Sequence, residues 1–301
     1  MKILVTGANG FLGQHLTLYL SHKSYDVVAC SRGKCRIPHQ KAFQYFSFDL
    51  TDANAVAAII ASSQPDVIVH AAAMSKPDEC ANNKEACYLN NVTATKFLLE
   101  ASKQFQPHFI YISSDFIFGE NGPHSEDDEA APLNYYGETK LQSEKLVVRS
   151  GLTYTVVRPV FIYGPILENM RPSFLHWVKN NLEQQKKIRV VSDQLRTPTF
   201  VLDICESIEK IITRRQQGTY NIAGKDLLSP YQMAIAVAEF LKLDATSIEE
   251  VTSDTFKEPV QRAKHSGLKI ERARKILGYE PVSFVKGIQL TFNNSIYAHP
   301  S

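Results

Sequence analysis

Over its first 165 residues the chain alternates short apolar, β-rich runs with amphipathic helical patterns, and this rhythm leaves few folds open to it. Continuous apolar strands joined by helices are typical of a parallel sheet covered on both faces. Right-handed crossovers then favour a doubly wound order, so the sequence predicts an α/β fold of the Rossmann type. We expect strands at 2–6, 26–31, 43–48, 66–71, 108–113 and 154–159, and helices at 11–23, 53–63 and 90–103.

The rhythm loosens after Gly164. We therefore predict a dinucleotide-binding Rossmann domain over residues 1–165 and a smaller substrate-binding lobe over residues 166–301. No linker separates the two, and part of 198–225 is expected to return to the Rossmann core, so that the lobe is interleaved with it. Helical patterns in this half occur at 172–186, 203–215, 229–242 and 284–294.

Composition and charge exclude several classes of protein. Of the 301 residues, 44% are apolar and 21% are charged, as in soluble globular proteins. A net charge of +2 gives no electrostatic case for binding nucleic acid or an anionic membrane surface. No apolar run approaches the roughly 18 residues of a membrane span. Five cysteines without Cys-x-x-Cys spacing indicate reduced thiols in a cytoplasmic protein, and we expect no metal site.

The segment VTGANGFLG places three glycines directly after the first expected strand and at the start of the first helix. A tight turn there needs a glycine with positive φ, and a pyrophosphate group must approach bare backbone. The helix N-terminus then offers unpaired N–H groups and a partial positive charge to the phosphates. The spacing is Gly-x-x-Gly-x-x-Gly, not the general Gly-x-Gly-x-x-Gly. The predicted dinucleotide contacts in this segment are Gly7, Asn9, Gly10, Phe11, Leu12 and Gly13.

The residues after the second strand indicate which dinucleotide binds. An acidic residue there would accept hydrogen bonds from the ribose of NAD, whereas arginine suits the 2′-phosphate of NADP. The chain has Ser31 and Arg32 and no carboxylate in CSRGKCR, which favours NADP, with NADPH preferred over NADH; a solvated basic loop is the alternative. Asp49 could bind the adenine or equally cap the next helix. The other cofactor contacts expected are Leu50, Ala71, Ala72 and Ala73.

Two Tyr-x-x-x-Lys pairs occur, Tyr19–Lys23 and Tyr136–Lys140. Because the chain has 13 Tyr, chance alone supplies roughly one such pair, and position has to decide between them. Tyr19 and Lys23 end the first helix, far from the carboxyl ends of the strands, where ligands bind in such sheets. Tyr136 and Lys140 follow the fifth strand and lie on one helical face. The second pair is therefore the predicted site.

The fifth strand ends in Ser113, Ser114 and Asp115, where a reacting carbonyl group would lie. Free tyrosine has a pKa of about 10, which is too high for efficient proton exchange near neutrality. A nearby ammonium group favours the phenolate, and lowering the pKa by about two units needs only about 2.7 kcal/mol. We therefore predict that Tyr136 exchanges the proton, Lys140 lowers its pKa and binds the cofactor ribose, and Ser114 holds the substrate oxygen.

Together these motifs resemble the extended short-chain dehydrogenase/reductase family over essentially the whole chain. The resemblance implies that Ser114, Tyr136 and Lys140 are catalytic and that Asn91 is a structural or proton-relay residue. Several segments are most similar to the dTDP-4-dehydrorhamnose reductase family. This implies reduction of the 4-keto group of a nucleotide-linked deoxysugar by NADPH or NADH, and it leaves a homodimer possible. The motifs that carry the resemblance are TGANGFLG, HAAA, NNV, SSDFIFG, NYYGETKLQSE, RPVFIYGP and LRTPTFVLDICESI.

The same resemblance implies a substrate site that includes Ser114, Asp115, Phe161, Arg196 and Arg262. A guanidinium group can grip a diphosphate bidentately, although either arginine could instead form ion pairs within the lobe. Three positions depart from the family pattern and leave the sugar and base open: Phe161 in place of Trp, His70 in place of Asn, and Ala263 in place of Pro.

Other functions stay open at this point. A nucleotide-sugar 4-epimerase shares every motif and would keep NAD tightly bound. The non-enzyme alternative is a regulatory protein that binds NADP without turning it over, and the regulatory subunit of methionine adenosyltransferase is similar to this same family. Intact Ser114, Tyr136 and Lys140 count against that alternative, although intact residues do not prove turnover.

Overall fold

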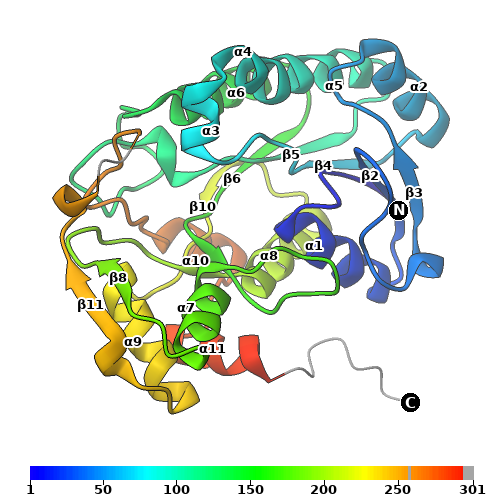
Figure 1. Cartoon of the computed structure of the whole chain (residues 1–301). Helices are drawn as coiled ribbons and strands as arrows, with labels where there is room; N and C mark the ends of the chain where they lie inside the picture. The colour runs from blue at the N-terminus through cyan, green and yellow to red at the C-terminus, as the bar shows by residue number, and fades with distance from the viewer. Residues whose placement is uncertain (257–258, 294–301) are drawn as a thin grey trace.

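The computed structural model describes residues 1–256 and 259–293. Its centre is a seven-stranded parallel sheet in the order β10-β6-β5-β4-β1-β2-β3 (Figure 1). The order is that of a doubly wound Rossmann fold, so the predicted fold class is confirmed. The strands are β1 (Lys2–Thr6), β2 (Asp26–Ser31), β3 (Gln44–Ser47), β4 (Val67–His70), β5 (His108–Ile112), β6 (Tyr154–Arg158) and β10 (Gly218–Asn221).

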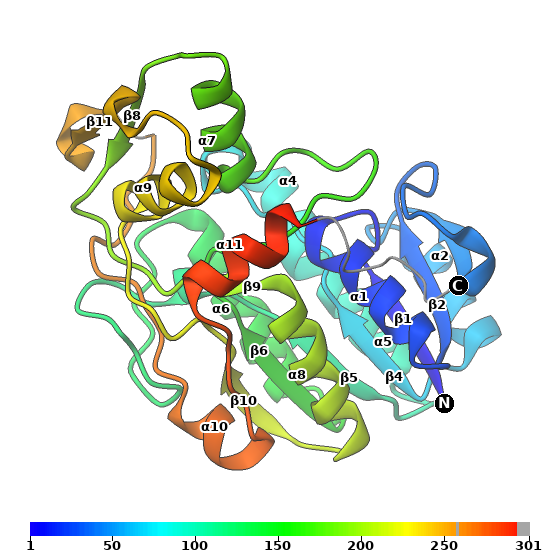
Figure 2. The ribbon, with the colours of Figure 1, turned by 90° about the horizontal axis from the view of Figure 1, so that it is seen from below.

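Helices cover both faces of this sheet (Figures 1 and 2). Successive side chains of a strand point to opposite faces. Ile3 and Val5 therefore pack in the apolar cluster beneath α1 and α8, while Leu4 packs in the cluster beneath α2, α5 and α6. These helices are α1 (Phe11–His22), α8 (Val201–Thr213), α2 (Ala53–Ser63), α5 (Ala94–Ser102) and α6 (Tyr135–Val148).

A smaller lobe has its own apolar cluster. It is built on two short parallel sheets, β8 with β11 and β7 with β9. The chain returns from it to the first unit through α8 and β10, and β10 extends the large sheet beside β6. The boundary at residue 165 stays a prediction. The elements of the lobe are β7 (Ile162–Tyr163), α7 (Phe174–Glu183), β8 (Ile188–Val191), β9 (Thr199–Phe200), α9 (Pro230–Leu241), β11 (Ile248–Val251) and α11 (Phe284–Phe292). Helix α10 (Glu271–Leu277) packs instead in the cluster of the large sheet, against α8 and β10.

Some expected elements differ in detail. The helix expected at 90–103 begins as a π-helical turn, η2 (Leu89–Thr93), and continues as α5. Two short helices before it, α3 (Pro77–Asn82) and α4 (Lys84–Tyr88), were not predicted. The helix expected at 284–294 ends at Phe292, and residue 294 lies outside the described residues. The 3-10 turns are η1 (Gln40–Ala42), η3 (Asp115–Ile117), η4 (Ala245–Ser247) and η5 (Ser253–Thr255).

The first Tyr-x-x-x-Lys pair joins two helices. The Tyr19 hydroxyl donates to Glu209 Oε2 on α8 at 2.6 Å, and Lys23 Nζ lies 3.7 Å from the same oxygen. This pair therefore has a structural partner at the far end of α1. Among the described residues, no helix combines the length and the apolar character needed to cross a membrane.

Candidate active site

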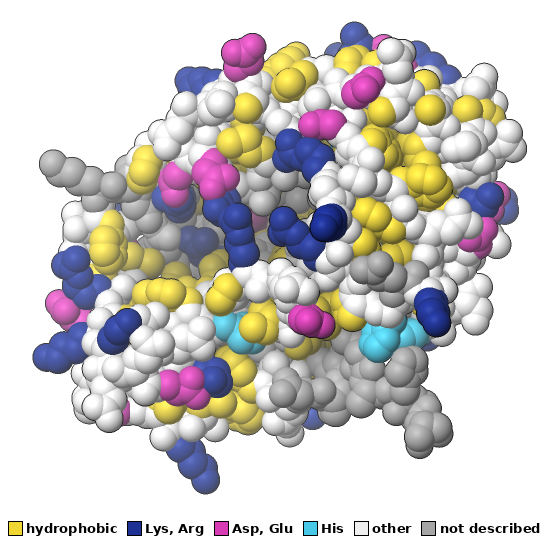
Figure 3. Space-filling model, turned by 45° about the vertical axis from the view of Figure 1, so that its right-hand side comes forward, with side chains coloured by type: hydrophobic (Ala, Val, Ile, Leu, Met, Phe, Trp, Pro, Cys, Tyr) yellow, Lys and Arg dark blue, Asp and Glu magenta, His cyan; other side chains and the backbone are white. Residues whose placement is uncertain are grey.

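A cleft of about 460 Å³ lies at the carboxyl ends of the central strands. In this sheet the strand order reverses between β1 and β4, which is the switch point where open α/β sheets bind their ligands. The volume is within the range of about 300–1,000 Å³ that is typical of small-molecule sites. Lys and Arg side chains gather around a hollow on one face of the molecule (Figure 3).

The glycine loop forms one wall of the cleft. Gly7 has a φ of +68°, and a Cβ atom there would lie 2.6 Å from the backbone nitrogen of Ala72. Gly10 is the N-cap of α1, whose first turn has neither a side-chain cap nor an acidic residue. Unpaired N–H groups and a positive helix end without a competing carboxylate suit a pyrophosphate group. The residues present therefore fit a dinucleotide.

With one exception, the predicted cofactor residues come together in this cleft. Asn9 is the exception, because its side chain bonds to the turn at 32–36 and does not line the cleft. Asp49 lines the cleft and does not cap α2, since the cap is Asp52, whose Oδ1 accepts N–H bonds from Asn54 and Ala55. Those lining it are Gly7, Gly10, Phe11, Leu12, Gly13, Ser31, Arg32, Asp49, Leu50, Ala71, Ala72, Ala73, Tyr136 and Lys140.

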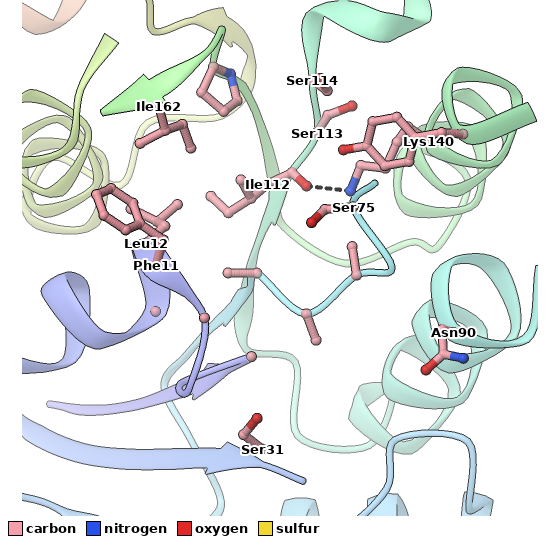
Figure 4. A pocket seen from close by; sticks show the side chains of 18 of the residues that line it. Phe11, Leu12, Ser31, Ser75, Asn90, Ile112, Ser113, Ser114, Lys140 and Ile162 are labelled. Carbon is pink, nitrogen blue, oxygen red and sulfur yellow. Dashed lines mark hydrogen bonds between the residues drawn. The ribbon is translucent and has the colours of Figure 1, made fainter. Parts of the chain in front are cut away.

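Helix α6 brings Tyr136 and Lys140 to the end of β5. The helix begins after Asn134, whose Oδ1 accepts the N–H of Gly137 at 3.1 Å. Lys140 Nζ donates to the carbonyl oxygen of Ile112 at 2.6 Å (Figure 4). The same ammonium group lies 4.2 Å from the centroid of the Tyr111 ring. The predicted pair is thus fixed at the strand end, on the side of the cleft opposite Phe11 and Leu12.

Ser114 connects this pair to the next residues of the chain. Its hydroxyl donates to Asp115 Oδ1 at 2.9 Å and accepts the N–H of Phe116 at 3.3 Å. Ser114 also interacts with the Tyr136 side chain, an interaction that acts to lower the Tyr136 pKa. A serine hydroxyl and a phenol therefore meet in the cleft, where they could both contact one carbonyl oxygen.

The pKa of Tyr136 differs from the expected one. Burial raises this pKa well above its usual value, and the interaction with Ser114 opposes the shift without cancelling it. The ammonium group of Lys140 is bonded to Ile112 and does not produce the expected lowering. Burial disfavours the charged form of either group, and it also lowers the pKa of Lys140 to about 7, against the opposing effect of Glu144. Tyr136 is therefore a protonated phenol near neutrality, as free tyrosine is, and the raised pKa makes it a weaker acid than the sequence predicted.

The low pKa of Lys140 predicts a pH-dependent stability. In the unfolded chain the lysine pKa is about 10.4, so between about pH 7 and pH 10 the unfolded state binds a proton that the folded state lacks. The wild-type chain therefore gains stability as the pH rises through this window, relative to Lys140→Met, which does not titrate. Denaturant unfolding should measure the free energy of unfolding of both proteins. Relative to the wild-type chain, we expect Lys140→Met to be most stable near pH 6 and to lose that advantage as the pH rises to 10. A difference in stability that stays flat across this window would contradict the shift.

Asn91 lies in the π-helical turn, a feature frequent at functional sites. Its Oδ1 accepts the N–H of Met74 at 2.7 Å, and its Nδ2 donates to Thr139 Oγ1 at 3.0 Å. It does not line the cleft. Of the two roles that the resemblance allowed, these bonds favour the structural one, because they tie the segment after β4 to α6.

The predicted substrate residues fall into two groups. Ser114, Asp115 and Phe161 line the cleft, and Phe161 has the unusual φ of +39°. Arg196 and Arg262 line a smaller adjoining cavity, which Asp115 also lines. The guanidinium carbon of Arg196 lies 5.7 Å from the Phe161 ring centroid.

Arg262 is held by an acidic partner. Its Nη2 donates to both carboxylate oxygens of Asp78 on α3, each at 2.9 Å. This is an ion pair between the C-terminal lobe and the first unit. The alternative expected for the arginines was an ion pair within the lobe, but the partner of Arg262 belongs to the first unit.

Sequence reasoning missed several lining residues. Ser75 follows β4 and Asn90 belongs to the π-helical turn, so both come from irregular backbone that no apolar periodicity indicates. Asn91, the neighbour of Asn90, bonds to the backbone of Met74, the neighbour of Ser75. The remaining missed residues are Phe48, Ile112, Phe116, Pro159 and Ile162.

The strand order, the glycine loop and the tyrosine–lysine pair beside it define the class of protein as an extended short-chain dehydrogenase/reductase. The model of the RmlD substrate binding domain matches residues 1–296. The chain therefore belongs to the RmlD substrate binding domain family, and the predicted resemblance is confirmed.

Individual proteins agree with this assignment. The crystal structure of dTDP-4-dehydrorhamnose reductase from Bacillus anthracis in complex with NADP has a TM-score of 0.84 and 25% identity, covering 96% of this chain and 97% of that one. Spore coat polysaccharide biosynthesis protein SpsK of Bacillus subtilis is 29% identical, covering 93% of each chain. Methionine adenosyltransferase 2 subunit beta of Pongo abelii is 32% identical, covering 83% of this chain and 75% of that protein.

Proposed function

We propose that this protein reduces the 4-keto group of a nucleotide-linked deoxysugar with NADPH as the hydride donor. The observation that carries the proposal is the convergence of Ser114, Tyr136 and Lys140 in the same cleft as the glycine loop. The name and bound NADP of the Bacillus anthracis reductase support it.

Each residue of the site has a separate role in the proposed reaction. When bound, the dinucleotide would supply a hydride for the carbonyl carbon. The oxygen then needs a proton, and Tyr136, whose pKa lies well above neutrality, carries one. Ser114 would hold the same oxygen by a hydrogen bond, and the first turn of α1 would bind the pyrophosphate. Lys140 would place its ammonium group beside the reacting groups, from its bond to Ile112.

The choice of NADP rests on the end of β2. Ser31 and Arg32 line the cleft, and the Arg32 side chain is 67% exposed. A guanidinium group there can bind a 2′-phosphate bidentately. The nearest carboxylate, Asp49, lies 3.7 Å from Arg32 and would orient it from the end of β3. This arrangement supports NADPH over NADH.

A second candidate is a regulatory subunit that binds NADP without turnover, which the identity to methionine adenosyltransferase 2 subunit beta favours. The presence of Ser114, Tyr136 and Lys140 together in the cleft favours the hypothesis of an enzyme. We also propose a cytoplasmic location, because all five cysteines are free thiols. The homodimer stays a prediction.

The test is NADPH oxidation with dTDP-linked 4-keto-6-deoxy sugars, against the UDP- and GDP-linked equivalents. We expect one NADPH consumed per sugar reduced with at least one member of the panel. Stoichiometric NADPH binding without oxidation across the panel would favour the regulatory subunit. Purification with NAD that stays bound and is regenerated at each turnover would favour an epimerase.

A further inference from the structure

Asn9 differs from the other residues of the glycine loop, because its side chain engages the 32–36 turn after β2. Its Nδ2 lies within donor distance of the carbonyl oxygens of Arg32 (3.1 Å) and Lys34 (3.0 Å). Its Oδ1 accepts the N–H of Arg36 at 2.9 Å. One primary amide thus uses both its donor and its acceptor sides on the backbone of a single turn.

Tyr45, on β3, engages the same turn. Its hydroxyl lies 2.9 Å from Asn9 Nδ2 and donates to the carbonyl oxygen of Gly33 at 2.8 Å, with Ser31 O at 3.3 Å. Together, Asn9 and Tyr45 bond to carbonyl groups of residues 31–34. We call these two side chains the Asn9–Tyr45 clasp.

The clasp determines which groups of the 32–36 turn remain available to bind a phosphate. The backbone carbonyls, which would repel a phosphate, are engaged by the clasp, whereas the side chains of Arg32, Lys34 and Arg36 are exposed. Ser31 lies in the pocket far from Lys140 and from the strand end where the reacting groups meet (Figure 4). The turn therefore offers cations at the end of the cleft that is remote from the chemistry.

We propose that Asn9 is a positioning residue for the choice of dinucleotide. The clasp fixes the turn so that Arg32 is presented to the 2′-phosphate of NADP. Bidentate binding by a guanidinium group needs a defined geometry, and a loose turn would have to be ordered during binding, which lowers affinity. This inference rests on the proposed function, since it assumes that the adenosine end of NADP lies beside Ser31 and Arg32.

The experiment compares two probes by calorimetry on the whole chain. The compound 2′,5′-ADP carries the 2′-phosphate, and 5′-AMP lacks it. For Asn9→Ala we expect affinity for 2′,5′-ADP to fall by about tenfold and affinity for 5′-AMP by less than about threefold. Tyr45→Phe, which removes only one hydroxyl, should show a smaller selective loss. Asn181→Ala, which removes an amide bonded to Trp177 O on α7, should change neither affinity.

Two results would overturn the inference alone. One is an equal loss for both probes, which would mean that Asn9 supports the glycine loop in general; the other is no loss at all. Should Asn9→Ala fail to fold, the selective loss expected of Tyr45→Phe carries the test. A wild-type chain that binds 2′,5′-ADP no more tightly than 5′-AMP would contradict the assignment of NADP, and the inference with it.

Discussion

Tyr136→Phe is expected to lower the rate of sugar reduction by roughly 10²- to 10⁴-fold, the usual contribution of a general acid. The substitution removes one hydroxyl from a buried side chain that packs edge-to-face against Phe116, so the fold has no reason to change. NADPH affinity should stay within about twofold, because a proton donor acts mainly in the transition state. Steady-state kinetics and NADPH titration of the same preparation measure both quantities.

The adjacent tyrosine provides a matched control. Tyr135 is half-buried on α6, and its ring contacts the ammonium group of Lys84, 5.2 Å from the ring centroid. Tyr135→Phe removes the same atom one residue away and should leave turnover unchanged. If Tyr136→Phe and Tyr135→Phe were both fully active, Tyr136 could not be the proton donor.

Gly13→Ala should abolish dinucleotide binding, of NADPH and NADH alike. A Cβ atom at this position would overlap the carbonyl oxygen of Gly7 and lie 2.8 Å from the Ala8 Cα atom. Both contacts are with backbone, so the loop itself must move and α1 must separate from it. The N–H groups that would hold the pyrophosphate then lose their arrangement. We expect at least about a hundredfold loss of affinity, measured by titration with both dinucleotides.

This prediction needs a separate measure of folding. Ser21→Ala changes α1 at the end remote from the glycine loop, where the hydroxyl donates to the Thr17 carbonyl oxygen. It should bind both dinucleotides normally. Gly13→Ala should keep a cooperative thermal unfolding transition, at a lowered temperature. Normal dinucleotide affinity in Gly13→Ala would show that the glycine loop does not hold the cofactor.

The sheet and its cleft could be predicted because their signals are local. Strands such as Lys2–Thr6 are continuous apolar runs, and the glycine spacing fixes a turn within a few residues. The residues that end successive parallel strands must meet at one edge, so most of the cleft followed from strand positions alone. The Tyr19–Lys23 pair could be discounted by the same argument, because it lies at the far end of α1.

The properties that depend on partners far apart in the chain could not be predicted. The direction of the Tyr136 pKa shift is set by burial among residues of several elements. Asn9 looked like a cofactor contact until its bonds to the 32–36 turn were visible. The partner of Arg262 is Asp78, which lies 184 positions away. No periodicity or motif in the sequence predicts these contacts between distant residues.

The most direct test uses NADPH with deuterium at both hydrogen positions of the nicotinamide C4, so that a hydride transferred from either face carries the label. The keto sugar nucleotide that is turned over is incubated with the labelled cofactor, and the product is examined by mass spectrometry and NMR. Direct reduction in this cleft requires one deuterium on carbon 4 of the sugar, with the oxygen protonated, and NADP released in equal amount. A product without deuterium at carbon 4, or labelled cofactor that binds and is never consumed, would contradict a hydride-transferring reductase.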